Sequence, residues 1–443
     1  ADFSLTETAV ALEELVVTGT ATEVRAREIG NALDAVTSRE LEAVPVTNPE
    51  DILSGRVPGL AVMQGAGQPG AGNTVRIRGQ TTASMISDPL VYVDGVRIFS
   101  LQIGTQGGAR VALSPLQDIP AEDIERIEVI KGAPAATLYG TEAARGVIQI
   151  FTKRGISGAP IWNAEISGGF NNQGRVGPEG DQWELFTKCG DQMYGIDMVK
   201  SRYGQHVLFE DPTCPSSGRW FSNGPVQRYS LSVRGGLGDI TYFLAGNYSG
   251  EEGTLPTQEA RTGGMRANFD FRPSQSFRVS LNTAYAIRDL SFVEDGNSAS
   301  GFLLNVGRGN SGNFKGGKGD DCEGVASGVT CVSNKYLFDG ENLTRADRFT
   351  GGLTVQYDAT EAITNRVTVG LDYNTVHNKW IRPWGGLRVP LGQYNDAITR
   401  TQKLSIDYAG SWNRGFGADS QYQSTFSWGA QIFKDDYRWM EVY

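Results

Sequence analysis

From residue 156 onward, apolar and polar residues alternate along the chain with a period of two. In 277–288 the odd positions hold Phe, Val, Leu, Thr, Tyr and Ile, whereas the even positions hold Arg, Ser, Asn and Ala. Successive side chains of a β-strand point to opposite faces, so this pattern indicates a sheet with one apolar and one polar face. It predicts strands at about 161–172, 226–235, 238–249, 263–272, 276–288, 347–358, 364–376, 400–411 and 418–433.

The connections between these strands alternate in length. The short ones are 235–237, 273–275, 359–363 and 414–417, and the long ones are 173–225, 250–262, 289–346 and 377–399. Outer-membrane barrels collect short turns at one end and long loops at the other, with aromatic residues near the strand ends. Such aromatic residues are present here at Tyr248, Tyr285, Trp380 and Trp412. Because a secreted β-sandwich or propeller has no reason to sort its turns, we predict an antiparallel transmembrane β-barrel.

The predicted barrel is incomplete. The 288 residues after position 155 (443 − 155) contain nine predicted strands, whereas bacterial single-chain barrels have even strand numbers. A barrel of about eight to ten strands is filled by its own side chains, and one that encloses a folded domain needs about 22 strands. We therefore expect about 9 of about 22 strands in this chain, which makes it a fragment of a longer protein.

Composition and charge narrow the class of protein further. The formal net charge is −10 and no stretch is rich in Lys or Arg, which disfavours a nucleic-acid partner. Apolar runs such as Leu90–Val93 are far shorter than the roughly 20 residues of a membrane-spanning helix. The chain does not start with a secretory signal pattern, so we expect any such signal to have been removed or to lie outside this sequence.

The first 155 residues follow a different pattern, in which short helices and strands are interleaved. Helix starts are indicated at Pro49, behind the capping residue Asn48, and at Pro120 and Pro134. The predicted strands are Leu60–Met63, Thr74–Arg78, Leu90–Val93, Arg126–Ile130 and Val147–Thr152. This half is therefore expected to form an α+β domain that contacts the polar faces of the barrel strands, at residues such as Arg278, Asn282 and Asp372.

The four cysteines fall into two of the long connections, Cys189 and Cys214 in one, Cys322 and Cys331 in another. Three pairings are possible. Local pairing closes the shorter loops and fits an oxidising compartment outside the cytoplasm. We predict the disulfides Cys189–Cys214 and Cys322–Cys331, with four free thiols as the alternative.

Several motifs of the first half identify a family. They are GRVPGL at 55–60, VRIRG at 75–79, PLVYVDGV at 89–96, IERIEVIKG at 124–132 and GVIQIFTKRG at 146–155. In this order they resemble the plug domain of TonB-dependent outer-membrane transporters, and the forms GRVPGL, VYVDGV and TKRG resemble the SusC/RagA branch. The resemblance is close over 13–155. It implies the end of an N-terminal extension domain at 1–12, a TonB box and linker at 13–30, a plug domain at 31–155 and the first barrel strands at 156–443.

The resemblance also implies roles for individual residues. Residues Glu14, Leu15, Val16, Val17 and Thr18 match the TonB box, a strand that a periplasmic coupling protein captures by β-augmentation. An ordinary edge strand is the alternative. In the plug strand motifs, Arg76 and Arg78 are predicted to be gating or structural residues, with Glu125 and Glu128 as buried partners. No substrate-binding residue is identified.

The function that the resemblance implies is TonB-dependent active import of a nutrient, an oligosaccharide or a peptide, across the outer membrane of a Gram-negative-type bacterium. The implied partners are a TonB-type periplasmic coupling protein, a SusD-like surface lipoprotein and outer-membrane lipid. We expect no enzymatic activity. A siderophore or vitamin receptor and a secreted glycan-binding β-protein are the alternatives; a membrane protein leaves Phe277, Leu281 and Ile287 bare on the outward face, whereas a secreted protein covers them.

Three patterns that could indicate nucleotide or metal binding are incomplete in this sequence. The GxGxxG pattern at 65–70 contains Pro69 and precedes a strand instead of a helix, so it is no dinucleotide site. The P-loop-like stretch at 312–318 lacks the Ser or Thr that binds a metal ion. With only His206 and His377, the chain has no material for a histidine-based metal site. We expect no cofactor and no metal, and interpret the acidic stretch 320–323 as a solvated loop.

Overall fold

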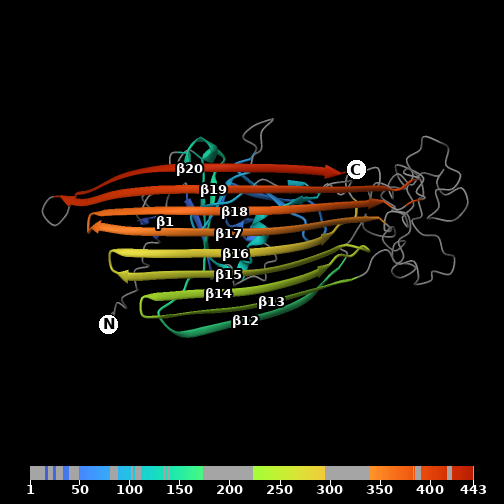
Figure 1. The fold of residues 1–443 in the computed structure, drawn as a ribbon, viewed down its shortest axis with the longest axis horizontal. Helices are drawn as coiled ribbons and strands as arrows, with labels where there is room; N and C mark the ends of the chain where they lie inside the picture. Colours follow the sequence, from blue (N-terminus) through green and yellow to red (C-terminus); the bar gives the residue numbers. More distant parts are fainter. Residues whose placement is uncertain are drawn as a thin grey trace, which may run out of the picture.

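The computed structural model describes residues 15–17, 23–25, 33–38, 49–79, 88–100, 103–104, 111–132, 135–136, 139–172, 223–294, 340–382, 384, 391–416 and 422–442. Long strands form one broad sheet, and a smaller N-terminal unit (residues 33–152) packs against one face of it (Figure 1). Within the described residues, no helix has the length and apolar character needed to cross a membrane.

The N-terminal unit is built on a mixed five-stranded sheet in the order β3-β10-β11-β6-β7. Its strands are β3 (Leu33–Thr37), β10 (Ile124–Ile130), β11 (Val147–Thr152), β6 (Leu90–Val93) and β7 (Val96–Arg97). Strands β11 and β6 run parallel, and the other neighbours run antiparallel. The apolar residues of β10 and β11 form part of its core, in which Ile127, Val129 and Ile148 are fully buried.

Short elements surround this sheet. Two further hairpins join β4 (Leu60–Gln64) to β5 (Asn73–Ile77) and β8 (Ile103–Gly104) to β9 (Ala112–Leu113). The helices are α3 (Pro49–Leu53) and the 3₁₀ turns η2 (Pro115–Asp118), η3 (Ala121–Asp123) and η4 (Thr141–Arg145). The predicted helix starts at Pro49 and Pro120 are confirmed, although Pro120 caps η3 from outside. Asn48 and Pro134 lie outside the described residues.

The nine-stranded sheet follows the chain order from β12 to β20, and all its neighbours are antiparallel (Figure 1). Its strands are β12 (Gly158–Asn171), β13 (Gly224–Leu237), β14 (Ile240–Glu252), β15 (Glu259–Ser274), β16 (Phe277–Ser291), β17 (Glu341–Thr360), β18 (Ile363–Arg382), β19 (Gln393–Phe416) and β20 (Tyr422–Val442). The predicted nine strands are thus confirmed, as is an α+β unit followed by an antiparallel sheet that forms part of a barrel.

The observed strands are longer than the apolar alternation predicts, because pairing continues where both faces become polar. Strand β19 has 24 residues, and its first residues, such as Asn395 and Asp396 on the side of the long connection, pair with β18 although neither is apolar. Backbone hydrogen bonds do not depend on the side-chain pattern, so the alternation marks only the part of a strand with an apolar face.

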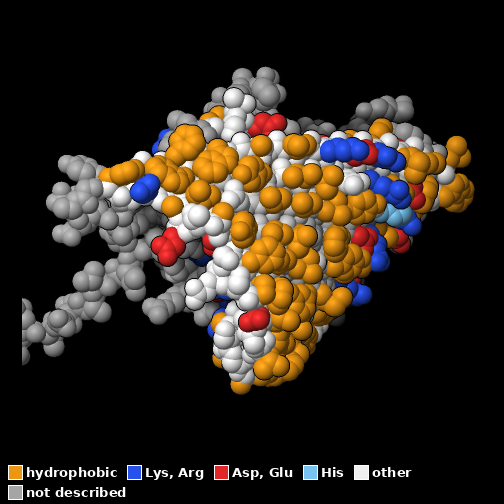
Figure 2. All heavy atoms as spheres, turned by 60° about the vertical axis from the view of Figure 1, so that its left-hand side comes forward, with side chains coloured by type: hydrophobic (Ala, Val, Ile, Leu, Met, Phe, Trp, Pro, Cys, Tyr) orange, Lys and Arg blue, Asp and Glu red, His pale blue; other side chains and the backbone are white. Residues whose placement is uncertain are grey.

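The two faces of the sheet differ in the predicted way. The face that turns away from the N-terminal unit is apolar over a wide area (Figure 2), and Leu281 on it is 41% exposed, with Phe277 and Ile287 half-buried. The opposite face contacts the N-terminal unit, and the backbone amide of Phe99 donates a hydrogen bond to Asp372 Oδ2 at 2.8 Å. The prediction that this unit contacts the polar strand face is confirmed.

Candidate gating interface between the N-terminal unit and the sheet

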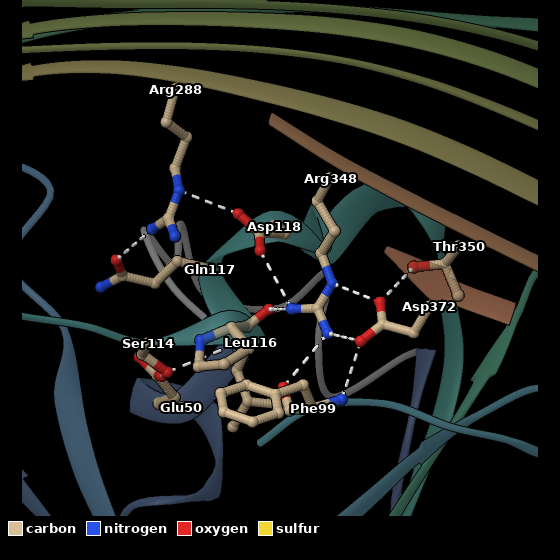
Figure 3. Close-up of polar contacts among 11 residues, drawn as sticks. Glu50, Phe99, Ser114, Leu116, Gln117, Asp118, Arg288, Arg348, Thr350 and Asp372 are labelled. Carbon is tan, nitrogen blue, oxygen red and sulfur yellow. Dashed lines mark hydrogen bonds and ion pairs between the residues drawn. The ribbon is translucent and has the colours of Figure 1, made fainter. Parts of the chain in front are cut away.

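Arg348 on β17 is the centre of the contacts between the two parts (Figure 3). Its Nε and Nη2 donate to Oδ1 and Oδ2 of Asp372 on the neighbouring strand β18, each at 2.8 Å. Its Nη1 donates to Asp118 Oδ2 of η2 at 3.1 Å. One buried guanidinium group therefore joins two strands of the sheet to the N-terminal unit, with the paired, planar geometry that arginine makes with carboxylates.

Asp118 is shared with a second arginine. Arg288 on β16 places its Nε 2.8 Å from Asp118 Oδ1, and its Nη1 donates to Gln117 Oε1 at 3.1 Å. We call Arg288, Arg348, Asp118 and Asp372 the Arg348 cluster. Its two positive and two negative charges balance, and all four side chains are buried. Desolvation offsets most of the attraction in a buried ion pair. Such a cluster therefore fixes the position of the N-terminal unit on the sheet while contributing little net binding free energy.

A second polar contact lies on β15. Arg266 Nε donates to Asp123 Oδ2 at 3.2 Å, and the side-chain amide of Asn268 donates to Thr152 Oγ1 at 2.8 Å. Thr152 Oγ1 in turn donates to Asp94 Oδ2 at 2.6 Å. Asp94 holds this position because it forms, with Gly95, the two-residue turn between β6 and β7, in which both residues have positive φ (49° and 84°).

The third contact involves the connection between β4 and β5. The amide of Gln68 donates from Nε2 to the carbonyl of Val293 at 2.9 Å and accepts from the Val293 N–H at 2.8 Å, and the side chain is buried. The next residue, Glu294, accepts hydrogen bonds from Trp380 Nε1 and Arg382 Nη2, both at 2.9 Å. Val293 and Glu294 directly precede the connection 295–339. Gln68 thus ties the N-terminal unit to the end of a barrel strand at the long-loop side.

The interface contains room for water as well as apolar contacts. A cavity of about 20 Å³ is lined by Asp118, Arg266, Arg348 and Thr350, together with apolar residues. This volume holds one water molecule, and the polar walls supply hydrogen-bond partners for it. Near the long-loop end, a small apolar cluster also spans the two parts. Its buried members are Ala71, Val111 and Leu113 of the N-terminal unit and Ala260, Leu290, Phe292, Ala346 and Val376 of the sheet.

Glu50 of α3 is buried beneath η2. Ser114 Oγ donates a hydrogen bond to it and also caps η2 by accepting from the Leu116 N–H at 3.3 Å (Figure 3). Burial raises the pKa of Glu50 to about 7, with a further increase from Asp51 and Asp118, while Ser114 and Arg288 lower it. The protonation state of Glu50 near neutral pH is therefore coupled, through the Ser114 hydrogen bonds, to the turn that presents Gln117 and Asp118 to the sheet.

The segment predicted to be the TonB box is described at its centre. Leu15–Val17 form β1, which pairs antiparallel with β2 (Glu23–Arg25) in a two-stranded sheet of its own. In Figure 1, β1 is seen toward the end of the broad sheet where the short turns lie. Glu14 and Thr18 lie outside the described residues. The coupling role of this segment stays a prediction.

The structure does not bring the four predicted gating residues together. Arg76 belongs to β5, whereas Arg78 follows it with a φ of 57° and donates its backbone N–H to Gly59 O at 2.6 Å. Glu128 accepts from Arg126 Nε on its own strand at 2.8 Å. Among the described residues, no ion pair joins Glu125 or Glu128 to Arg76 or Arg78. Their gating role is therefore still a prediction, while the expected pairing is replaced by Arg126–Glu128.

Sequence reasoning identified Asp372 as a contact but missed its partners. Arg288 and Arg348 occupy inward positions of strands β16 and β17, where most neighbouring inward residues are uncharged. A charged residue on a face that must become buried requires an opposite charge, and this was the available signal. All four cysteines lie outside the described residues, so the two disulfides also stay predictions.

Comparisons with known proteins agree with this architecture. Residues 25–147 match the family described as TonB-dependent Receptor Plug Domain. TonB-dependent receptor P26 of Formosa agariphila is 25% identical over 397 residues, which cover 88% of this chain and 38% of that protein. TonB-dependent receptor SusC of Bacteroides thetaiotaomicron is 26% identical over 298 residues, 66% of this chain and 28% of that protein.

A solved structure of the RagAB peptide importer in its closed-closed state superposes with a TM-score of 0.69 at 21% identity, over 93% of this chain and 48% of that chain. This likeness shows a shared fold. The chain spans less than half the length of these relatives. The matched plug domain, the antiparallel sheet around it and these relatives together place the chain among the TonB-dependent receptors of the SusC/RagA kind.

Proposed function

We propose that the full-length protein imports a nutrient across the outer membrane, and that a TonB-type coupling protein drives import by pulling on Glu14–Thr18. The observation that carries this proposal is the polar plug interface centred on Arg348 and Asp118, which has room for a water molecule. Polar contacts at an interface that also admits water can be exchanged for contacts with water one at a time. A plug held in this way can be rearranged by a pull without exposing a large apolar core. The proposed role requires no covalent chemistry.

The outward face of the sheet supports a place in a membrane. On five successive strands the outward apolar run ends, toward the long connections, at Ile287, Phe349, Tyr373, Leu404 and Ile432. The next outward residues are polar: Asp289, Asp347, Thr375, Gln402 and Lys434. This apolar boundary is what a bilayer would require at its edge.

The boundary crosses the strands obliquely, as it should in a barrel. Register partners on neighbouring strands form a row across the sheet that starts at Ile287 and passes through Asp347, Thr375 and Arg400 to Arg438. On β20 the apolar run ends at Ile432, six residues before Arg438 (438 − 432), so the boundary is displaced along the strands by six residues. Six residues correspond to about 20 Å along a strand, and four strand spacings to about 19 Å across the sheet. The implied strand tilt of about 45° lies at the upper end of the range for transmembrane barrels, about 35–45°.

The proposals for the cargo and for a second partner rest on the similarity of the chain to the SusC/RagA branch. We infer an oligosaccharide or peptide cargo and a SusD-like surface lipoprotein that covers the long-loop side. Uptake of labelled oligosaccharides, peptides and a ferric siderophore by cells with the full-length receptor tests the cargo class. Siderophore uptake alone would contradict this inference.

The coupling role is tested by Val16→Pro in the full-length receptor. Proline removes the Val16 backbone N–H and fixes φ, so the segment can no longer add to the partner's sheet. Energised uptake should be lost, while equilibrium cargo binding to de-energised cells is retained. Val24→Pro on β2 is the matched control, because it disturbs the β1–β2 pair but leaves Glu14–Thr18 unchanged. Equal loss of uptake in both variants, or loss of binding together with uptake, would contradict the proposal.

A further inference from the structure

The N-terminal unit is hydrogen-bonded to one side of the broad sheet but not to the other. The wall residues that hold it all lie on β15–β18: Arg266, Asn268, Arg288, Arg348 and Asp372. Strand β7 of the unit also lies against β18 and β19. In the described part of the chain, however, no hydrogen bond or ion pair joins β19 or β20 to the N-terminal unit.

The inward charged side chains of β19 and β20 instead find their partners across the two strands. Lys403 Nζ donates to Asp435 Oδ1 and Oδ2 at 2.7 and 2.6 Å. Gln431 Nε2 donates to Asp407 Oδ2, and both pairs are register partners. If the N-terminal unit moved away from these strands, their charges would stay paired. At the Arg348 cluster, the same movement would remove a carboxylate from a buried cation, which is costly.

The facing charge of the N-terminal unit is also neutralised within its own part of the chain. Arg97 of β7 forms an ion pair with Glu142 of η4. Its guanidinium group lies over the ring of Phe433 on β20, 4.7 Å from the ring centroid. A cation–π contact of this kind crosses the interface without a hydrogen bond. Its loss therefore leaves Arg97 with its carboxylate partner.

Each of the two parts also holds a buried hydroxyl group that has no hydrogen-bond partner in the described structure. These groups are Tyr92 Oη of β6 and Thr401 Oγ1, which lies two residues from Lys403 on β19. Tyr92 is the register partner of Arg97, and Asp407 of β19 is among the charges that act on its hydroxyl group. A buried hydroxyl group without a partner is unfavourable, and water that enters supplies the missing hydrogen bond. Water entry is therefore favoured at β19 and β20.

We propose that cargo crosses the barrel between the N-terminal unit and the inward faces of β19 and β20, while the contacts with β15–β18 keep the unit attached. The paired side chains of Lys403, Asp435, Asp407 and Gln431 line this passage. They suit a hydrophilic cargo, because its hydroxyl or amide groups can exchange hydrogen bonds with such a wall and with water. The inference rests on the proposed function, since a passage is needed only if the receptor imports a cargo.

The test measures when buried inward positions become accessible. Ser405→Cys reports on β19 and Ala286→Cys on β16; both residues are small, inward and buried, at 4% and 8% exposure, and Ala286 lines the cavity beside Arg348. Ala409→Cys is a second reporter on β19, at 2% exposure. Cells with the full-length receptor are treated with a membrane-impermeant maleimide, in the presence of the oligosaccharides and peptides of the uptake assay. The wild type gives the labelling of the native cysteines, which is subtracted.

Both β19 reporters should be labelled roughly tenfold faster in energised cells than in cells treated with a protonophore, because the passage opens only during transport. The rate at Ala286→Cys should be the same in both. The bulky label at Ser405→Cys should then block further uptake.

Equal acceleration at Ala286→Cys would overturn the inference, because the whole plug would then leave the wall. Acceleration at Ala286→Cys alone would place the passage at β16. Energised uptake by the unlabelled Ser405→Cys receptor, measured in the same cells, tests the proposed function separately. Uptake without faster labelling of either β19 reporter contradicts only the passage.

Discussion

Arg348 and Asp372 form a two-point contact between adjacent strands, with both nitrogen–oxygen distances at 2.8 Å, and the same guanidinium group also reaches Asp118 of the plug. The strand-to-strand contact orients the arginine toward the plug, because Asp372 fixes the plane of the guanidinium group. The plug supplies one carboxylate to two arginines: Arg348, which Asp372 also orients, and Arg288, which binds Gln117 and Asp118 of the plug itself.

Removing the shared carboxylate should loosen the plug. In Asp118→Asn, Arg288 loses its carboxylate partner and Arg348 keeps only Asp372, so a buried positive charge is left uncompensated. We expect the plug to lose about 3–5 kcal/mol of stability, measured as protease cleavage of the plug in the assembled receptor against urea concentration. Asp436→Asn removes a solvent-exposed pair on β20 and should leave plug stability unchanged. Equal effects in the two variants would show that the Arg348 cluster does not hold the plug.

Plug stability should fall as the pH rises from about 4.5 to about 7. The buried Glu50 has its pKa raised from 4.5 to about 7, so the folded plug binds a proton that the unfolded chain releases in this range. The stability that this proton contributes is complete below pH 4.5 and lost above pH 7, a difference of roughly 3 kcal/mol. Urea titrations at several pH values measure it. Glu50→Gln should remove this part of the pH dependence, and an unchanged slope would contradict the assignment.

The contact between Gln68 and Val293 can be tested by hydrogen exchange. Gln68→Ala removes both hydrogen bonds to the Val293 backbone, so the Val293 amide should exchange faster by roughly one to two powers of ten, equivalent to about 1–3 kcal/mol. Gln68→Glu keeps an acceptor for the Val293 N–H but loses the donor, and should retain part of the protection. Asn268→Ala, at the separate contact on β15, should leave Val293 unchanged. Full protection of Val293 in Gln68→Ala would contradict this account.

A charge on the outward face should impair assembly. Leu353 lies on β17 within the apolar band and is 42% exposed. In the proposed membrane location, Leu353→Arg places a cation against lipid, at a cost of about 2–4 kcal/mol near the middle of the bilayer. The amount of heat-modifiable, folded receptor in the outer membrane should fall. Leu353→Ile keeps the side chain apolar, so it is the matched control and should assemble normally. Thr354→Arg is not suitable as a control, because Thr354 lies on the inward face of the same strand.

The strands of the broad sheet could be read from the sequence, because the alternation within 277–288 is imposed by the apolar outward face and recurs in other strands. The plug strands β4, β5, β6, β10 and β11 were also predicted, whereas β3, β7, β8 and β9 were not, since these short segments carry no clear apolar pattern. The charged contacts were not. Asp118 and Arg348 are 230 positions apart, and no local rule links a turn after Ser114-Pro115 to a strand in another domain.

Glu50 shows a different limit of sequence reasoning. An acidic residue in the first turn of a helix is ordinarily explained by the helix dipole and is expected at the surface. In this protein α3 has only five residues, and η2 covers it, so the same residue becomes a buried acid. Burial of this kind depends on how two short elements pack, and neither element carries a periodicity long enough to predict its buried side.

The place of β3 at the edge of the five-stranded plug sheet determines how a mechanical load would enter the plug. A force that arrives from the N-terminal side meets Leu33 first, and β3 has β10 as its sole neighbour in that sheet. Asp34, next to that end, is tied by an ion pair to Lys131, which also holds the carbonyl of Pro58 at 2.8 Å. Five residue pairs can therefore yield before the four remaining strands are strained. Under such a load, β3 is therefore expected to separate from β10 before the contacts of Asp118 with the sheet begin to exchange with water.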